Sequence, residues 1–432
     1  MSYYAIRQMP QDWPQEVSEQ SALLMFGELF QRGYGNGLID AAEARGFHII
    51  RSTVGRREKT GVLRALLAEE LAQQTQPFIN VPLEAGFDLW TGDGTVPLVE
   101  ILKDIKLTEW GSAKLDFQLI EKKRKGAQED FRERVKLYVK ALENLISDER
   151  HLLIAHLMAG GVPRAKIIMP LMNRVFKGTG DRHISSRQFW ESDLGQLCAI
   201  SFQEVTAESF RILIEETTQL RRRLEKENRK ISYTAYGYHG TEVLYDGKFQ
   251  WQSYSPYLQG WAKKKLEDIS RSFFEKGVAC AVYNCPEILT NSSSIFQGVE
   301  IPLYPLLYAG EKNHSHSITY QNLKKACQSL LKETVTVQQV QKICEAFLMD
   351  TDFQKTLRFE DWPSHSHQTQ MEKLLKTSDE LIALHRDEKS LMTNLLSEVV
   401  FKACGEIMLC DAQQPQQPVA WINHDVISQV SF

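Results

Sequence analysis

The fold of this chain is decided by the stretch from Ala22 to Gly46, ALLMFGELFQRGYGNGLIDAAEARG. Residues 22–27 form an apolar run, 33–37 a glycine-rich turn, and 38–46 an alanine-rich segment that ends at a glycine. This order predicts a strand, a turn and a helix, which together open a nucleotide-binding fold. Glycines in the turn let the backbone approach a pyrophosphate, whose charge is favoured at the N-terminus of the following helix.

The glycines of this stretch, taken alone, fit two interpretations, a dinucleotide-binding loop and an ordinary surface loop. Gly27, Gly33 and Gly35 are spaced as G-x5-G-x-G, whereas the usual dinucleotide-binding pattern is G-x-G-x-x-G. A glycine-rich surface loop before a helix would contain the same residues. The rest of the chain has to decide between the two interpretations.

Short apolar segments recur along the chain at the spacing of an α/β protein. Helical stretches, including residues 129–146 and 207–227, separate them. This alternation predicts an α/β fold with a Rossmann-like, doubly wound parallel sheet that binds its ligand at the carboxyl ends of the strands. The expected strands after the first one are Phe47–Ile50, Phe78–Val81, Leu152–His156, Ile231–Ala235 and Val278–Tyr283.

The alternation also predicts how the chain is divided. Residues 1–314 are expected to form a Rossmann-type core, with a surface insertion around residues 83–120. Residues 315–432 show no strand alternation and are expected to form a mainly helical C-terminal extension packed on the core. The helices expected in that extension are residues 320–331, 337–349 and 371–409.

Composition narrows the class of protein. The 432 residues carry a net charge of -4, which argues against a dedicated nucleic-acid binder. No apolar run reaches the ~18 residues of a membrane span, and the N-terminus lacks the apolar core of a signal peptide. The seven cysteines form no C-x-x-C pair and the eleven histidines are scattered, so no metal site is expected. A cytoplasmic protein is the prediction.

The segment WQSYSPYLQGWAKKKLE, from Trp251 to Glu267, carries a pair of residues suited to reduction chemistry. Eight residues separate Tyr254 from Lys263. An ammonium there would lower the pKa of the phenol and hold a cofactor hydroxyl, while the phenol would bind the substrate oxygen where negative charge develops. Tyr257, which six residues separate from Lys264, is the alternative acid. A plain helix-surface pair is the other alternative.

Polar and glycine-containing residues follow three of the expected strands. They are HLMAGG at 156–161, YGYHGTE at 236–242 and NCPEILTNSSS at 284–294. Because parallel strands present their carboxyl ends to the ligand, these segments are expected to form the site. The segment 291–308 is expected to be a mobile element on the substrate side, with a fixed helix packed in the core as the alternative.

Together these residues resemble the enoyl-acyl carrier protein reductases of the short-chain dehydrogenase/reductase superfamily. The likeness is to the FabV and trans-2-enoyl-CoA reductase type, and more closely to the divergent FabMG type. The glycine loop from Gly27 to Gly35, the segment Tyr238–Glu242 and the Tyr254-x8-Lys263 element carry the resemblance. Residues 290–295 and 301–307 look like the substrate loop of the FabV type. These matches span about residues 22 to 307.

The resemblance implies NAD(P)H-dependent reduction of a trans-2-enoyl thioester, carried by acyl carrier protein or CoA, to the saturated acyl thioester in fatty acid biosynthesis. It implies that the core of residues 1–314 binds NAD(P) and is catalytic, and that Tyr254, Lys263 and Tyr238 are its catalytic residues. The substrate contacts that it implies are Tyr238, Tyr257, Ser292 and Ser293. The cofactor contacts that it implies are Gly27, Gly33, Tyr34, Gly35, Arg51, Ala159, Gly160, Lys263, Pro286 and Thr290.

The choice of cofactor stays open between NADH and NADPH. Arg51, Arg56 and Arg57 follow the second strand, where a 2′-phosphate would sit, and no acidic residue lies between Arg51 and Arg57. This pattern favours NADPH, whereas the resemblance favours NADH, which is the prediction. Two alternative functions are a carbonyl reductase acting on a ketone or aldehyde, which would normally use Y-x3-K, and a non-catalytic nucleotide-binding scaffold.

Overall fold

The computed structural model describes residues 3–59, 61–245, 248–252, 258–290, 297–358 and 366–432. Its centre is a sheet of eight parallel strands in the order β1-β12-β11-β8-β7-β2-β3-β6. The strands are β1 (Ala5–Ile6), β2 (Ser21–Glu28), β3 (His48–Ser52), β6 (Phe78–Ile79), β7 (His151–His156), β8 (Lys230–Tyr236), β11 (Cys280–Asn284) and β12 (Val419–Ile422).

Every strand that the sequence predicts is present, and the α/β fold with a doubly wound parallel sheet is confirmed. Two further strands of this sheet, β1 and β12, were missed, as were the strands of two small ribbons outside it. β12 pairs with β11 through Val282 and Val419, so the region after residue 315 adds a strand to the central sheet. A run of four apolar residues that follows a Gln/Pro stretch is too short to be recognised without its neighbour. The division of the chain at residue 314 stays a prediction.

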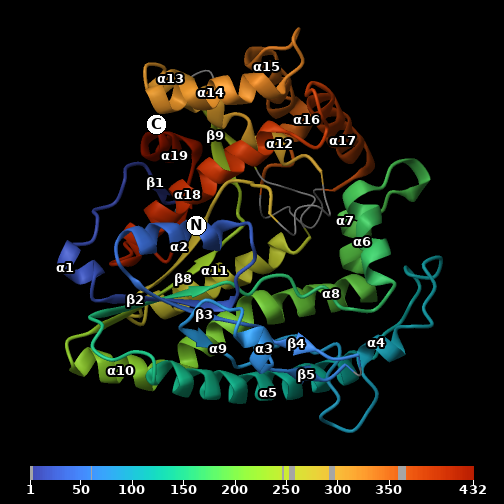
Figure 1. The fold of residues 1–432 in the computed structure, drawn as a ribbon. Coiled ribbons are helices and arrows are strands. Elements are labelled where there is room, and N and C mark those ends of the chain that lie inside the picture. The colour runs from blue at the N-terminus through green and yellow to red at the C-terminus, as the bar shows by residue number, and fades with distance from the viewer. Residues whose placement is uncertain (1–2, 60, 246–247, 253–257, 291–296, 359–365) are drawn as a thin grey trace.

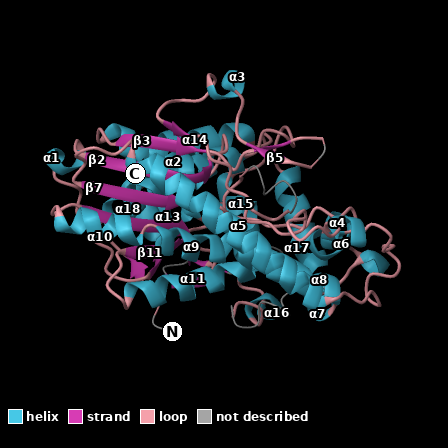
Figure 2. Cartoon of the chain, turned by 90° about the horizontal axis from the view of Figure 1, so that it is seen from below, coloured by secondary structure: helices cyan, strands magenta, loops and turns pink. Residues whose placement is uncertain are grey.

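Helices cover both faces of the sheet (Figures 1 and 2). One face packs against α5 (Phe117–Glu143), α9 (Ser209–Glu216), α10 (Thr218–Lys226) and α11 (Gly260–Phe274). The other face packs against α2 (Tyr34–Ala44) and α18 (Met392–Ala412). Both faces are apolar because successive side chains of a buried parallel strand point to opposite sides, as Leu23 and Leu24 do in β2.

The helices α2 and α18 touch through their backbones. A Cβ on Gly37 would lie 1.9 Å from the carbonyl oxygen of Phe401, and one on Gly405 would lie 2.1 Å from the carbonyl carbon of Gly37. Only glycine permits this approach. Gly37, which the sequence placed in the turn, therefore serves the packing of the two helices.

The C-terminal region contains α12 (Glu300–Leu303), α13 (Leu306–His314), α14 (Ile318–Leu330), α15 (Val337–Leu348), α16 (Thr351–Gln354), α17 (Gln368–Ala383) and α19 (His424–Ser431) besides α18. The single helix expected over residues 371–409 is two helices, α17 and α18, with a bridge between Leu331 and His385 near the break. Figure 1 shows α13, α14 and α15 lying above α18, on the side away from the sheet.

The remaining described elements are short or lie beyond one end of the sheet. In Figure 2, α4 (Leu98–Ile101), α6 (Ile168–Lys177), α7 (Ser186–Glu191) and α8 (Asp193–Gln203) gather there. The small elements are α1 (Gln15–Ser18), α3 (Ala68–Leu71) and the two-stranded ribbons β4 (Arg56–Arg57) with β5 (Leu63–Arg64), and β9 (Thr241–Tyr245) with β10 (Lys248–Gln252).

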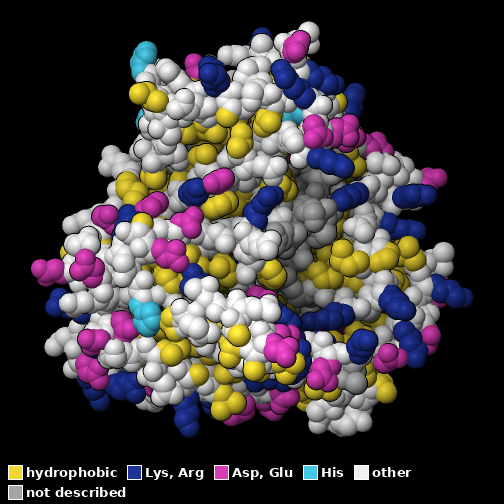
Figure 3. All heavy atoms as spheres, viewed as in Figure 1, with side chains coloured by type: hydrophobic (Ala, Val, Ile, Leu, Met, Phe, Trp, Pro, Cys, Tyr) yellow, Lys and Arg dark blue, Asp and Glu magenta, His cyan; other side chains and the backbone are white. Residues whose placement is uncertain are grey.

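The surface mixes charges of both signs. On the face in Figure 3, Lys and Arg side chains are more frequent on the right and Asp and Glu on the left, with hydrophobic side chains exposed between them. Among the helices that the structure describes, none is both long enough and apolar enough to cross a bilayer.

Candidate active site

The glycine loop between β2 and α2 has one open position. Gly33 is the N-terminal cap residue of α2 with a φ of 148°, and among the described residues a Cβ there would meet only the Thr290 methyl group, at 3.9 Å. A Cβ on Gly35 would lie 2.9 Å from the Leu29 side chain, and one on Gly27 would lie 3.2 Å from Met158. Gly33 therefore leaves room for a phosphate at the start of α2, while Gly27 and Gly35 allow the loop to pack.

Tyr34 joins the glycine loop to the far side of the site. Its hydroxyl donates a hydrogen bond to the carbonyl of Pro286, which follows β11. Its ring lies nearly parallel to that of Tyr236 at the end of β8, with centroids 5.4 Å apart. The structure thus brings together Gly33, Tyr34, Pro286 and Thr290, which the resemblance assigns to the cofactor. Tyr236 was not among the predicted site residues.

A crevice opens at the carboxyl ends of β2 and β7, where the order of strands reverses. Its volume is about 240 Å³, and Glu28, Phe30 and Ala159 are among its lining residues. Gly160 has a φ of 106°, and within the part of the chain that the structure describes no atom lies within 4 Å of where its Cβ would be. Open α/β sheets bind their ligands at such a reversal point. Ala159 and Gly160 therefore lie where the sequence analysis expected a cofactor to pass.

Lys263 is buried at the end of β8. It lies in the first turn of α11, only 7% exposed, and its Nζ donates a hydrogen bond of 2.7 Å to the carbonyl oxygen of Tyr236. Burial lowers the pKa of Lys263 to about 8. Lys264, by contrast, lies 3.4 Å from Asp268 in an ion pair on the outer side of the helix. The positions of the two lysines favour Lys263 as the lysine of the predicted pair.

The phenol of Tyr238 lies beside the carboxyl group of Glu287, which follows β11, and favours the ionised form of that group. Burial raises the pKa of Glu287 to about 8. At neutral pH this carboxyl group therefore keeps its proton for most of the time. Sequence reasoning missed Glu287, although it lies within the strand-end segment 284–294 that was expected to form the site.

A buried network holds the segment that carries Tyr236 and Tyr238. The carboxylate of Glu267, fully buried on α11, lies 3.0 Å from His239 Nδ1 and accepts a hydrogen bond of 2.9 Å from Asn284. Arg271 donates to the same carboxylate over 3.1 Å. Burial opposes ionisation of Glu267, but the hydrogen bonds from His239 and Asn284 and the charge of Arg271 outweigh it, so the pKa stays below its ordinary value.

The arginines that the sequence offered to a 2′-phosphate are all paired with carboxylates. Arg51 donates to Glu43 over 2.9 Å, Arg56 to Glu28 over 2.8 Å and Arg57 to Glu84 over 2.5 Å. None of the three partner carboxylates lies between residues 51 and 57, so the local pattern could not reveal them. This pairing removes the main argument for NADPH.

Four of the predicted site residues, Tyr254, Tyr257, Ser292 and Ser293, lie outside the described residues. The described part of the segment expected to be mobile is packed in the core. Residues 300–303 and 306–314 form α12 and α13, and Ile301, Tyr304 and Leu307 are buried. This packing favours the fixed-helix alternative for residues 300–308.

One protein family matches this chain over nearly its whole length. Residues 2–431 match the family model described as Enoyl-acyl carrier protein reductase FabMG. No curated protein sequence matches the chain.

Two solved structures are similar to it over nearly their full length. The first, described as the apo structure of FabMG, a novel type of enoyl-acyl carrier protein reductase, is 40% identical with a TM-score of 0.94. The second, described as the NADH-bound structure of FabMG, is 36% identical with a TM-score of 0.78. Each comparison covers 99% of this chain and 98% of the other.

Proposed function

The chain belongs to the FabMG family of enoyl-acyl carrier protein reductases, and we propose that NADH is its hydride donor and that Lys263, Tyr238 and Tyr254 are its catalytic side chains. As a member of this family, it reduces the double bond of an enoyl thioester, which was the first prediction from the sequence. The observation that supports the proposed site most directly is the buried ammonium of Lys263 at the end of β8, held by the Tyr236 carbonyl.

The residues at the strand ends fit a dinucleotide. The open position at Gly33 offers the start of α2 to a pyrophosphate, and the crevice beside Glu28 and Ala159 lies at the reversal point of the sheet. A related structure is described as bound to NADH. The residues proposed to contact NADH are Gly27, Gly33, Tyr34, Gly35, Arg51, Ala159, Gly160, Lys263, Pro286 and Thr290.

The proposed mechanism divides the work between cofactor and protein. Bound NADH supplies a hydride to the β-carbon of the enoyl thioester. Negative charge would then develop on the thioester oxygen, where the phenol of Tyr254 would donate a hydrogen bond or a proton. Transfer of a proton to the α-carbon would complete the saturated thioester. The ammonium of Lys263 holds a ribose hydroxyl and stabilises charge near that phenol. Tyr238 would bind at the thioester oxygen, with its hydroxyl beside the carboxyl group of Glu287.

The finer assignments rest on the same resemblance. Tyr257, Ser292 and Ser293 are proposed to contact the substrate, with Tyr257 as the alternative acid. We also propose that the substrate is carried by acyl carrier protein or CoA, that the protein serves fatty acid biosynthesis in the cytoplasm, and that its fold belongs to the short-chain dehydrogenase/reductase superfamily.

One assay tests the proposal. The full chain is mixed with NADH and either crotonyl-CoA or a panel of ketones and aldehydes, and the loss of NADH absorbance is followed. Oxidation of NADH with crotonyl-CoA alone is the expected result. Turnover of ketones without turnover of crotonyl-CoA would support a carbonyl reductase instead, and binding of NADH with no turnover of either would support a scaffold.

A further inference from the structure

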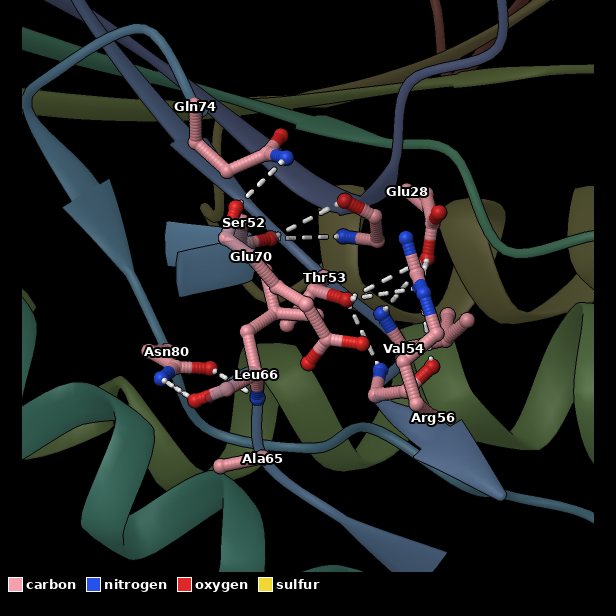
Figure 4. Close-up of polar contacts among 12 residues, drawn as sticks. Glu28, Ser52, Thr53, Val54, Arg56, Ala65, Leu66, Glu70, Gln74 and Asn80 are labelled. Atoms are coloured by element: carbon pink, nitrogen blue, oxygen red, sulfur yellow. Dashed lines mark hydrogen bonds and ion pairs between the residues drawn. The ribbon is translucent and has the colours of Figure 1, made fainter. Parts of the chain in front are cut away.

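The carboxylate of Glu28 lies over the carboxyl end of the neighbouring strand, β3 (Figure 4). Glu28 is the last residue of β2, and its Oε2 accepts hydrogen bonds from Thr53 Oγ1 at 3.2 Å, Val54 N at 3.4 Å and Arg56 Nη1 at 2.8 Å. The same side chain lines the crevice at the reversal point of the sheet. In dinucleotide-binding folds, residues at the end of the second strand of the βαβ motif, here β3, contact the 2′ position of the adenosine ribose.

The backbone that carries Glu28 is held in place by Ser52. The buried Ser52 hydroxyl accepts a hydrogen bond from Gly27 N at 3.1 Å and faces the carbonyl oxygens of Met25 at 2.8 Å and Gly27 at 3.0 Å. Gly27 has a φ of 116°, which turns the chain directly before Glu28. The position of the carboxylate is therefore set by backbone contacts between β2 and β3.

The charges around the crevice disfavour an additional phosphate. Glu28, Glu84 and Asp88 line it, together with Arg164, whose guanidinium lies 3.1 Å from both Glu84 and Asp88. The nearby Arg56 is held by Glu28 over 2.8 Å. Among the described residues, three carboxylates and one guanidinium line the crevice, while Arg56 and Arg57 pair with Glu28 and Glu84 from beside it. A 2′-phosphate placed against Glu28 would therefore meet like charge at close range, and the guanidinium groups nearby are already held by carboxylates.

We propose that Glu28 selects NADH over NADPH. Its carboxylate accepts a hydrogen bond from the ribose 2′-hydroxyl, repels a 2′-phosphate and keeps Arg56 from binding one. The sequence pattern that normally signals this choice, an acidic residue after the second strand, is missing here because the acid comes from the end of the first strand of the unit. This inference rests on the proposed use of a nicotinamide dinucleotide and names the residue that decides which one.

The test is the binding of NADH and of NADPH to the full chain, measured by fluorescence titration without substrate. Glu28→Gln is expected to weaken NADH binding by roughly tenfold, because a hydrogen bond to a charged acceptor is lost. It is also expected to tighten NADPH binding, since the repulsion disappears and Arg56 is released. The double variant Glu28→Gln/Arg56→Ala is expected to lose the gain for NADPH.

Two further variants make the result specific. Glu70→Gln removes a carboxylate that pairs with Arg64 over 2.5 Å nearby, and it is expected to leave the ratio of the two affinities unchanged. Glu28→Asp keeps the charge and is expected to go on rejecting NADPH, which covers the case in which Glu28→Gln fails to fold. An unchanged ratio in Glu28→Gln would overturn the inference. Failure of the wild-type chain to bind either cofactor would instead overturn the proposed use of NADH and the inference with it.

Discussion

The Nζ of Lys263 donates a hydrogen bond of 2.7 Å to the carbonyl oxygen of Tyr236. This contact ties the first turn of α11 to the end of β8, so the ammonium is held at the carboxyl end of that strand, directly before the segment that carries Tyr238. Because the side chain is buried, its charge acts at short range in a medium of low polarity. Lys264, the next residue, has its ammonium on the other side of the helix beside Asp268.

Lys263→Ala is expected to reduce turnover of an enoyl thioester by about 10²-fold or more, because the charge beside the acid is lost. Lys264→Ala is the matched control and is expected to keep near wild-type turnover. Steady-state kinetics with NADH and crotonyl-CoA, with circular dichroism to confirm folding, measures both. A dead Lys264→Ala beside an active Lys263→Ala would move the assignment to the pair of Tyr257 and Lys264.

Tyr254→Phe is expected to lower turnover by about 10²- to 10⁴-fold, because the phenol is the proposed acid. The affinity for NADH is expected to stay near that of the wild type, because the hydroxyl acts on the substrate. Tyr257→Phe is the matched control on the same segment. If Tyr257→Phe is the inactive variant and Tyr254→Phe remains active, Tyr257 is the acid.

Two glycines near the start of α2 are expected to respond differently to alanine. Gly33→Ala places a methyl group where the pyrophosphate is proposed to bind, so NADH affinity is expected to fall, and the φ of 148° at this position adds a backbone cost in stability. Gly37→Ala drives a methyl group to within 1.9 Å of the Phe401 carbonyl, so stability falls by about 3 kcal/mol. Thermal unfolding and NADH titration of both variants separate the effects. Equal NADH affinity in Gly33→Ala and wild type would place the pyrophosphate elsewhere.

The raised pKa of Glu287 predicts a pH-dependent stability. The group has a pKa of about 8 in the folded chain against an ordinary value of 4.5, so the folded state holds a proton that the unfolded state releases. Its contribution to stability is complete below pH 4.5 and is lost as the pH rises through about 8. The amide of Glu287→Gln does not ionise, so this variant lacks the pH dependence.

Between pH 4.5 and about 8, the unfolding free energy of the wild type is therefore expected to fall relative to that of Glu287→Gln as the pH rises. Other titrating groups, including Lys263, are common to both proteins and cancel in the difference. Urea unfolding at a series of pH values measures it. A difference that does not change with pH would mean that Glu287 is ionised in the folded chain throughout the range.

The sequence by itself predicted six strands of the central sheet and their parallel arrangement. Each of these strands is a local apolar run, and each is followed by polar or glycine-containing residues. The glycine loop before α2 and the position of Lys263 near the start of a helix could also be predicted, since they depend on neighbours a few residues away. The short strand β12 could not, because four apolar residues become a strand only beside β11.

Tertiary structure alone decided the pairings between distant residues. Glu28 meets Arg56, Glu287 meets Tyr238 and Gly37 meets Gly405 only after the strands and helices have packed. Each of these contacts joins two segments that are apart in the sequence, and hydrophobic periodicity describes only one segment at a time. The arginines after β3 predicted a phosphate site because their charges were counted without partners. The folded chain supplies the carboxylates from elsewhere, and the charge that remains at the site is a property of the packing.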